Sequence, residues 1–351
     1  MSPSRIKVVV ALSGGVDSSA AAALLLEAGY ECIGVFLITS ERGRHAEEEA
    51  REVARRLGID LHILDVRAQF EQIVDYFCDE YSRGRTPNPC VVCNRLIKFG
   101  RLWEFARETG AQFLATGHYA TIARHNGEPA LYESANTAKD QSYVLSMIER
   151  QVLGHVLFPM GEYSKSQARQ IARRLGLGTH DKEESQEICF VPDDAYAAFL
   201  EERRPSLSRE GPITDSSGRV LGTHGGIHRY TIGQRRGLRV AMGQPYYVTR
   251  LDPLTNTVEL GPKGEVMHRT LTATGVNWLV DPPSSPWTAT VKVRYNSPGK
   301  AATLTLGGDG VRVEFHGPVM AITSGQLAVF YADENGRRRV VGAGWIDRVG
   351  H

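Results

Sequence analysis

Short apolar runs alternate with amphipathic segments through the first 200 residues. The apolar runs have the length of buried strands: "KVVVAL" (7–12), "CIGVFLI" (32–38), "DLHILDV" (60–66) and "QFLATG" (112–117). The segments between them read as helices: one from about Ser18, then "AEEEAREVARRLG" (46–58), "QFEQIVDYFCDEYSRG" (69–84) and "LIKFGRLWEFARETG" (96–110). Strands that alternate with helices in this way predict an α/β fold with a parallel sheet.

The pattern changes near residue 200, where short β-prone runs punctuated by Gly, Pro and Asn replace it. Examples are "PYYVTRLDPLTNTVELG" (245–261), "ATVKVRYN" (289–296) and "LAVFYADENGRRRVVGAGWI" (327–346). Many short strands of this kind predict small β-barrels or sandwiches. We therefore expect three domains: an α/β domain over residues 1–203, a small β-rich domain over 204–267 and a C-terminal β-barrel over 268–351.

Composition narrows the class of protein. A chain of 351 residues with 42% hydrophobic and 23% charged residues suits a globular protein of several domains. Because no apolar run reaches the length of a membrane span and the N-terminus lacks a signal-peptide core, we expect a cytoplasmic protein without a membrane partner. Residues 201–351 carry a net charge of about +6 and residues 1–200 about −5. This imbalance is compatible with an anionic polymer as partner, and also with ordinary surface composition.

The glycine-rich stretch "ALSGGVDSS" (11–19) joins a predicted strand to a predicted helix. Gly14 and Gly15 lack Cβ atoms, so the backbone can turn sharply and present its N–H groups to an anion. Asp17 and Ser18 then stand at the helix start, where free donors and the helix dipole favour phosphate. The stretch is neither a Walker A loop nor a dinucleotide fingerprint. It resembles the PP-loop of the ATP pyrophosphatase superfamily, which cleaves ATP between the α and β phosphates.

The five cysteines are too few and too unevenly spread for a disulfide framework, so functional thiols are expected to be reactive or metal-binding. In "RTPNPCVVCNRLIKF" (85–99) the prolines predict an extended loop, with a helix from Asn94 onwards. Cys93 would then lie near a helix N-terminus with Arg95 and Lys98 nearby, which stabilises a thiolate. Cys32 and Cys78 lie in apolar patterns and are expected to be core residues.

Several segments together resemble the bacterial tRNA-specific 2-thiouridylase family, in the family's order and over nearly the whole chain. They are "SGGVDSS" (13–19), "GRTPNPCVVCNRLIKF" (84–99), "ATGHYA" (115–120), "KDQSYVL" (139–145), "LFPMGEYSK" (157–165), "SQEICFV" (185–191) and "YTIGQRRGL" (230–238). The family installs sulfur at position 2 of the wobble uridine, position 34, in tRNAs for Lys, Glu and Gln. The resemblance implies a PP-loop domain followed by two smaller β-rich domains that help to hold the tRNA.

The resemblance also implies the reaction. ATP, with Mg²⁺, adenylates the C2 oxygen of the uridine, because that oxygen is otherwise a very poor leaving group. Cys189 bears a persulfide received from a sulfur-relay protein or a cysteine desulfurase, and its sulfur replaces the activated oxygen with release of AMP and pyrophosphate. Cys93 is the partner thiol, which either releases the sulfur as a reactive species or resolves the intermediate, and a disulfide between Cys93 and Cys189 is left for a reductant to reopen.

Binding residues are carried over by the same resemblance. The ATP site would comprise Ala11, Leu12, Ser13, Gly14, Gly15, Val16, Asp17, Ser18, Leu37 and Gly117. The tRNA contacts would be Asn88, Pro89, Cys90, His118, Lys139, Asp140, Gln141, Arg294, Tyr295 and Gln326. Two alternatives stay open: His118 also suits a structural histidine, and Arg229, Arg235 and Arg236 suit either phosphate contacts or a solvated basic loop.

The chain departs from many relatives at Cys90, where they have Asp. Cys90, Cys93 and Cys189 make three soft ligands that suit an iron-sulfur cluster, while Cys90 also suits a spare thiol for disulfide exchange. The segment "FLITSERGRHAEEEA" (36–50) departs as well, so the resemblance does not identify the details of the adenine pocket. Two other functions remain: another PP-loop enzyme, such as an amidotransferase-type synthetase, and a non-catalytic RNA-binding protein.

Overall fold

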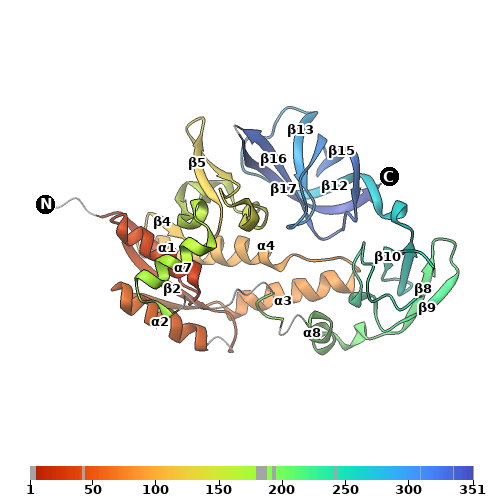
Figure 1. Ribbon diagram of the computed structural model, residues 1–351, viewed down its shortest axis with the longest axis horizontal. Coiled ribbons are helices and arrows are strands. Elements are labelled where there is room, and N and C mark those ends of the chain that lie inside the picture. The colour runs from red at the N-terminus through yellow and green to blue at the C-terminus, as the bar shows by residue number, and fades with distance from the viewer. Residues whose placement is uncertain are drawn as a thin grey trace.

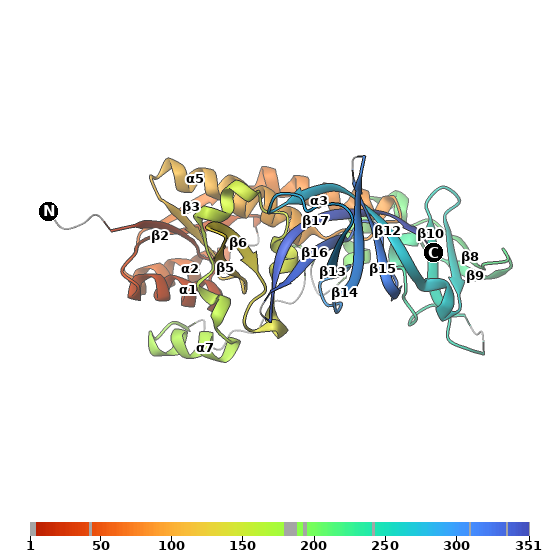
Figure 2. The same ribbon diagram turned by 90° about the horizontal axis from the view of Figure 1, so that it is seen from above.

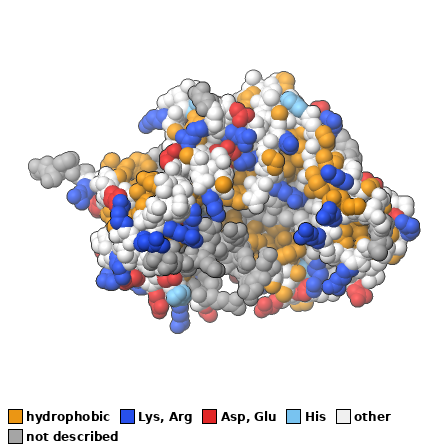
Figure 3. Space-filling model, viewed as in Figure 1, with side chains coloured by type: hydrophobic (Ala, Val, Ile, Leu, Met, Phe, Trp, Pro, Cys, Tyr) orange, Lys and Arg blue, Asp and Glu red, His pale blue; other side chains and the backbone are white. Residues whose placement is uncertain are grey.

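A computed structural model describes residues 5–41, 44–178, 188–191, 195–240, 243–308, 310–334 and 336–350. Figures 1 and 2 show three lobes in a row along the longest axis: an α/β domain, a β-barrel and a small sheet. The expected α/β fold followed by two β-rich parts is therefore confirmed. Figure 3 shows Lys and Arg side chains scattered over one face with acidic ones among them, in keeping with a net charge of +1.

The α/β domain is built on a five-stranded sheet in the order β3-β2-β1-β4-β7, in which every pair is parallel. Its strands are β1 (Lys7–Ala11), β2 (Glu31–Ile38), β3 (Leu61–Asp65), β4 (Phe113–Ala115) and β7 (Val156–Leu157). Alternate residues of a strand point to opposite faces. Val8 and Val10 pack with helices α1 and α2, while Val9 packs with the helices on the other face. The predicted strands 7–12, 32–38, 60–66 and 112–117 are thus confirmed.

Helices cover both faces of this sheet. They are α1 (Val16–Glu27), α2 (Arg44–Leu57), α3 (Arg67–Ser82), α4 (Pro89–Cys93), the π-helix η2 (Asn94–Arg101), α5 (Leu102–Glu108), α6 (Ser142–Leu145), α7 (Lys165–Arg174) and α8 (Tyr196–Arg203). Short 3-10 turns are η3 (Thr137–Lys139), η4 (Arg150–His155), η5 (Pro159–Glu162), η8 (Pro205–Leu207), η9 (Ile227–Arg229) and η10 (Lys263–Val266). The expected extended loop through Pro89 is wrong, because a helix begins at that residue. Asn88 caps it by accepting a bond from the Val91 N–H at 3.4 Å, and proline suits the first turn.

The C-terminal lobe is a closed antiparallel barrel in which β12 pairs with both β15 and β17. Its strands are β12 (Met267–Trp278), β13 (Trp287–Lys292), β14 (Lys300–Gly307), β15 (Gly310–Met320), β16 (Leu327–Glu334) and β17 (Arg337–Gly350). A hairpin of the α/β domain, β5 (Thr121–His125) and β6 (Glu128–Tyr132), extends the same sheet, because Tyr132 pairs with Arg339 of β17. One sheet therefore crosses from the α/β domain into the barrel.

The small lobe is a four-stranded sheet in the order β10-β11-β8-β9. Its strands are β8 (Gly211–Asp215), β9 (Val220–His224), β10 (Tyr247–Asp252) and β11 (Thr257–Gly261). Helix α3 runs towards this lobe beside α4 (Figure 1), and the turn after it approaches Leu251, which lies 3.4 Å from an ideal Cβ on Gly84. No helix in the described part of the chain is both long and apolar enough to span a bilayer.

Candidate active site

The glycine-rich loop lies between β1 and α1, as expected. Gly14 has φ +70°, and a Cβ there would stand 2.7 Å from the Ala46 carbonyl oxygen of α2, so this position requires glycine. Gly15 is the N-cap of α1, and no side chain caps the helix. Ser18 steadies the loop instead, because its hydroxyl donates to the Gly15 carbonyl at 3.0 Å and accepts from the Ser13 N–H at 3.2 Å. An uncapped helix start behind a tight turn is suited to an anion.

Gly117 lies against the back of this loop. A Cβ on Gly117 would stand 2.7 Å from both the Asp17 carbonyl carbon and the Ser18 nitrogen. Backbone from two separate elements therefore meets at a distance that only glycine allows. The turn after β4 therefore packs directly against the glycine-rich loop. The family resemblance places this turn in the ATP site.

Asp17 is held by two side chains that the sequence reading assigned no role. Lys165, at the start of α7, donates to both Asp17 carboxylate oxygens at 2.9 and 2.8 Å. The Tyr119 hydroxyl donates to the same carboxylate at 2.6 Å. Both residues lie within the quoted segments "ATGHYA" and "LFPMGEYSK", so the segments carried the signal although the roles could not be assigned. The ion pair is four-fifths buried on the Lys165 side and joins α7 to the loop.

A cavity of about 420 Å³ connects the loop to the three cysteines. Its walls come from β1, β2, α2, α3, α4, η2 and the turn at residues 188–190. The lining residues are Ala11, Leu12, Ser13, Val35, Phe36, Leu37, Thr39, Ala46, Phe70, Ile73, Pro89, Cys90, Cys93, Ile97, Lys98, Ile188, Cys189 and Phe190. Segments from the start, the middle and the end of the α/β domain thus form one site.

Helix α4 presents Cys90 and Cys93 to the cavity. Its entry is fixed from the barrel, because the Gln326 side chain donates to the Thr86 and Pro87 carbonyls at 3.0 and 3.1 Å. Its exit is fixed from α6, where the Asn94 side chain donates to the Val144 carbonyl at 3.0 Å. The placement of these two thiols therefore depends on two other parts of the fold.

Cys189 is presented by a short turn anchored by aromatic packing. The neighbouring Phe190 packs edge-on against Phe70 and Phe77 of α3, with ring centroids 5.7 and 5.2 Å apart. The Val191 N–H bonds to the Ile188 carbonyl at 2.8 Å and closes the turn. The first three residues of the quoted segment "SQEICFV" lie outside the described residues, which resume at Ile188.

The thiols of the cavity are desolvated. Burial raises the pKa of the Cys93 and Cys90 thiols. Burial, and then the neighbouring Cys93 and Cys90, raise the pKa of Cys189 to about 12. Cys90 and Cys189 are nevertheless exposed residues at the cavity rim. Cys93 ends α4 and stands at its junction with η2, so the helix N-terminus expected beside it lies at Pro89 instead. Burial raises the pKa of Cys93, while Lys98, which the sequence places nearby, lowers it. Cys32 and Cys78 are buried, as expected.

Among the residues that the structure describes, no three His, Cys, Asp or Glu side chains lie close enough together to hold a single metal ion. Cys90, Cys93 and Cys189 nevertheless line one cavity, so an iron-sulfur cluster bridging them stays a hypothesis.

Several residues expected to contact tRNA make internal bonds. His118 is 9% exposed, and its ring lies between Phe99 and Phe158. Asp140 is buried, where it accepts from the Ser134 and Ser142 N–H groups, and Gln141 accepts from the Tyr119 N–H at 2.9 Å. The burial of His118 and its packing against Phe99 and Phe158 favour the structural alternative for this residue.

Two of the predicted tRNA contacts in the barrel differ, because Arg294 makes internal bonds and Tyr295 is partly exposed. Arg294 donates through Nη2 to the Ile232 and Ala321 carbonyls and to the Thr323 hydroxyl, at 2.9, 2.8 and 2.6 Å. Its guanidinium joins the small lobe to the barrel, and a phosphate contact would compete with these bonds. Tyr295 is 38% exposed and packs on Tyr143 with ring centroids 6.2 Å apart.

The cationic residues considered for tRNA contact differ in exposure and pairing. Lys139 is half-buried, whereas Arg235 and Arg236 are exposed. Arg229 forms an ion pair with Glu201 of α8, so it serves the fold.

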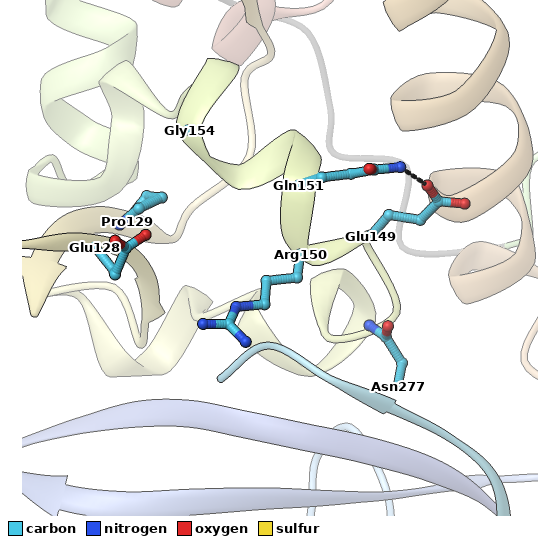
Figure 4. Close-up of a pocket in the computed structure, with 7 residues that line it drawn as sticks. All are labelled: Glu128, Pro129, Glu149, Arg150, Gln151, Gly154 and Asn277. Atoms are coloured by element: carbon cyan, nitrogen blue, oxygen red, sulfur yellow. Dashed lines mark hydrogen bonds between the residues drawn. The ribbon is translucent and has the colours of Figure 1, made fainter. Parts of the chain in front are cut away.

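A second cavity, of about 480 Å³, lies at the seam between the α/β domain and the barrel (Figure 4). Its polar groups are already paired: Gln151 donates to Glu149 at 2.8 Å, and Arg150 to Asp281 at 2.6 Å. Asn277 of β12 donates to two carbonyls of the α/β domain at 3.0 and 2.8 Å. With no thiol among its lining residues and with Gln151, Arg150 and Asn277 already paired, this cavity belongs to the domain seam.

Protein-family models match the chain in three consecutive parts. They are described as a tRNA methyl transferase HUP domain (residues 6–193), a tRNA methyl transferase PRC-barrel domain (197–262) and an aminomethyltransferase beta-barrel domain (268–346). The tRNA-specific 2-thiouridylase MnmA of Syntrophotalea carbinolica is 45% identical, over 97% of this chain and 98% of its own length. The MnmA of Carboxydothermus hydrogenoformans is 44% identical over 98% of both chains, and that of Clostridium perfringens 41% identical over 98% of this chain and 99% of its own. With this likeness over the full length, the chain belongs to the tRNA-specific 2-thiouridylase family.

Proposed function

We propose that the protein replaces the C2 oxygen of the wobble uridine of tRNA with sulfur, in a reaction driven by ATP. One observation carries the proposal: a single cavity is lined by Ala11, Leu12 and Ser13, which lead into the glycine turn, and by Cys90, Cys93 and Cys189. A phosphate site within reach of several thiols is what an enzyme needs if it activates an oxygen and then displaces it with sulfur. The names of the relatives support the same reaction.

The ATP step uses the loop end of the cavity. Residues 11–18, Leu37 and Gly117 would bind ATP, with the phosphates on the uncapped start of α1. Mg²⁺ would arrive as part of the ATP complex, where it neutralises phosphate charge. Attack of the uridine oxygen on the α-phosphate releases pyrophosphate and leaves the oxygen bonded to AMP, a good leaving group.

The sulfur step uses the opposite wall. A persulfide on Cys189, supplied by a sulfur-relay protein or a desulfurase, would attack C2 through its terminal sulfur and expel AMP. Cys93 then attacks the Cys189 sulfur, forms a disulfide with it and leaves the terminal sulfur on the base. The Cys93 thiolate, having lost its proton, supplies the electron pair of the new S–S bond, and the pair of the broken S–S bond stays on the sulfur of the base. An external reductant then reopens the Cys93–Cys189 disulfide.

Substrate tRNA would approach at the rim where α4 and the barrel meet. Asn88, Pro89 and Cys90 would lie beside the target base, with the exposed ring of Tyr295 available for stacking. Burial, and then the nearby Asp140 and Cys90, raise the pKa of the Tyr295 hydroxyl. The tRNAs for Lys, Glu and Gln are the proposed substrates.

A methyl transfer would suit the wording of two of the family models, but it does not use this site. Transfer of a methyl group from a preactivated donor needs neither a loop that cleaves ATP nor several thiols in one cavity. Sulfur transfer accounts for both features.

The test is nucleoside mass spectrometry of unmodified tRNA for Glu after incubation with the protein, Mg·ATP and sulfide or a persulfide donor. We expect 2-thiouridine at position 34 with the wild-type protein and none with Cys189→Ser or Cys93→Ser. Cys32→Ala, which removes a thiol buried on the other side of the sheet, is the matched control and should retain activity. Thiolated product from both active-site variants would refute the proposal.

A further inference from the structure

The helix that follows the two cysteines of α4 is wound as a π-helix over Asn94–Arg101. Its hydrogen bonds join residues five apart, as in the bond from the Leu102 N–H to the Ile97 carbonyl. In an α-helix, residues five apart point about 140° away from each other. The π-helical turn instead brings Lys98 towards the side of Cys93, and both side chains line the active-site cavity.

Lys98 carries the only formal charge among the described residues that line this cavity. No carboxylate in the described part of the chain lies within ion-pair distance of its ammonium group. Its hydrogen-bond partner is the Nε2 atom of His118, 3.4 Å from Nζ. A half-buried ammonium that faces thiols and a neutral ring lacks the anion that would stabilise it.

The protonation state of His118 follows from this contact. Burial, and then the charge of Lys98, lower the pKa of His118 well below its ordinary value, so the ring is neutral. An ammonium group can only donate, so Nε2 accepts from Lys98 and the proton lies on Nδ1. Nδ1 then donates to the Thr116 hydroxyl at 2.7 Å. Thr116, just after β4, thus orients the His118 ring, and the His118 ring holds the Lys98 ammonium at the cavity.

We propose that Lys98 is the cation that stabilises anionic sulfur in the active-site cavity, and that His118 is a positioning residue that holds its ammonium group there. The proposal rests on the proposed sulfur transfer and deepens it, because thiolates and persulfide anions are the nucleophiles of that reaction. Its chemistry is one ionisation: the thiol gives its proton to solvent, and the negative sulfur remains opposite the ammonium. No bond to Lys98 forms and no electron moves.

The charges around the thiols agree with this assignment. Burial raises the pKa of Cys90, Cys93 and Cys189, and Lys98 is the nearby cation that lowers the pKa of each of them. Among the described groups, the thiols also act on one another: Cys90 raises the pKa of Cys93, and both raise the pKa of Cys189. The phenol of Tyr295 lies near Cys90. Without Lys98, every described charge that acts on these sulfurs opposes ionisation.

The test is alkylation by iodoacetamide, followed by mass spectrometry that resolves each cysteine, on the purified full chain between pH 7 and 11. Because only the thiolate reacts, the rate reports the ionised fraction. We expect Lys98→Met to slow alkylation of Cys93 and Cys189 at pH 8 by about tenfold, the equivalent of one pKa unit. Lys98→Arg keeps the charge and should restore most of the rate.

The control is Arg95→Met, which removes an exposed cation from the same π-helix and should leave both alkylation rates unchanged. Circular dichroism and the urea midpoint establish that each variant is folded, and Lys98→Gln serves if Lys98→Met is not. Equal alkylation rates across this pH range in wild type, Lys98→Met and Lys98→Gln overturn the proposal. The readout needs no tRNA, so a failure of uridine thiolation and a failure of this proposal are separate results.

Discussion

Replacing Gly117 by alanine should impair ATP cleavage while leaving the thiols untouched. An alanine Cβ would stand 2.7 Å from the backbone of Asp17 and Ser18, where the closest ordinary contacts begin near 3.4 Å. The loop would have to recede by about 0.7 Å, and overpacking of this kind costs about 1–3 kcal/mol of folding stability. Since misplacement of reacting groups by about 1 Å can cost ~10²-fold in rate, we expect AMP formation to fall 10- to 100-fold.

The assay is release of AMP and pyrophosphate from Mg·ATP in the presence of unmodified tRNA, with urea unfolding measured alongside. Gly264→Ala is the matched control, because a Cβ at that position meets no atom within 4 Å. Alkylation of the cysteines should be unchanged in both variants. Wild-type AMP formation by the Gly117→Ala protein would refute the reasoning from backbone contact.

Other predictions concern bonds that hold the site together. Arg294→Ala should lower the free energy of unfolding by about 1.5–3 kcal/mol in urea, as loss of charged hydrogen bonds does, with no change in the salt dependence of tRNA binding. Gln326→Leu should speed amide hydrogen exchange at the start of α4, because both bonds that pin this entry are lost. His118→Leu should slow alkylation of Cys93 without changing the dissociation constant for tRNA, whereas weaker tRNA binding with normal alkylation would mean that His118 contacts RNA. Lys292→Met should cost about 3–5 kcal/mol in urea, because it leaves the buried Asp140 without its cation and Glu133 with Arg338 alone, 3.6 Å away.

The regular elements of the α/β domain could be predicted because each strand and helix repeats its own period. The helix start at Pro89 could not, since it depends on a capping bond from Asn88 that competes with the extended preference of an X-Pro pair. The β5–β6 hairpin was missed although Asn126 and Gly127, both at positive φ, form the Asn-Gly turn typical of hairpins. Its partner strand lies 200 residues away, beyond any local pattern.

The site was predictable in its chemistry and not in its electrostatics. Cysteines and a glycine-rich loop can be recognised as residue types, so the sequence indicates which groups react. Whether Cys93 is ionised depends on what surrounds it, and that is set by Phe190 packing on α3 and by the π-helical turn before Lys98. Such tertiary contacts leave no periodic trace in the chain.

The pairing of Tyr132 with Arg339 makes the hairpin of the α/β domain the continuation of the barrel sheet. This hairpin sits between Gly117 and the turn that holds Asp140, so both segments are tied to the barrel. A protein truncated after residue 267 would lack β17, and the unpaired backbone N–H and C=O groups of β6 would form an exposed sheet edge that favours aggregation. The barrel is thus no exchangeable module, and the two lobes are expected to melt together in one calorimetric transition.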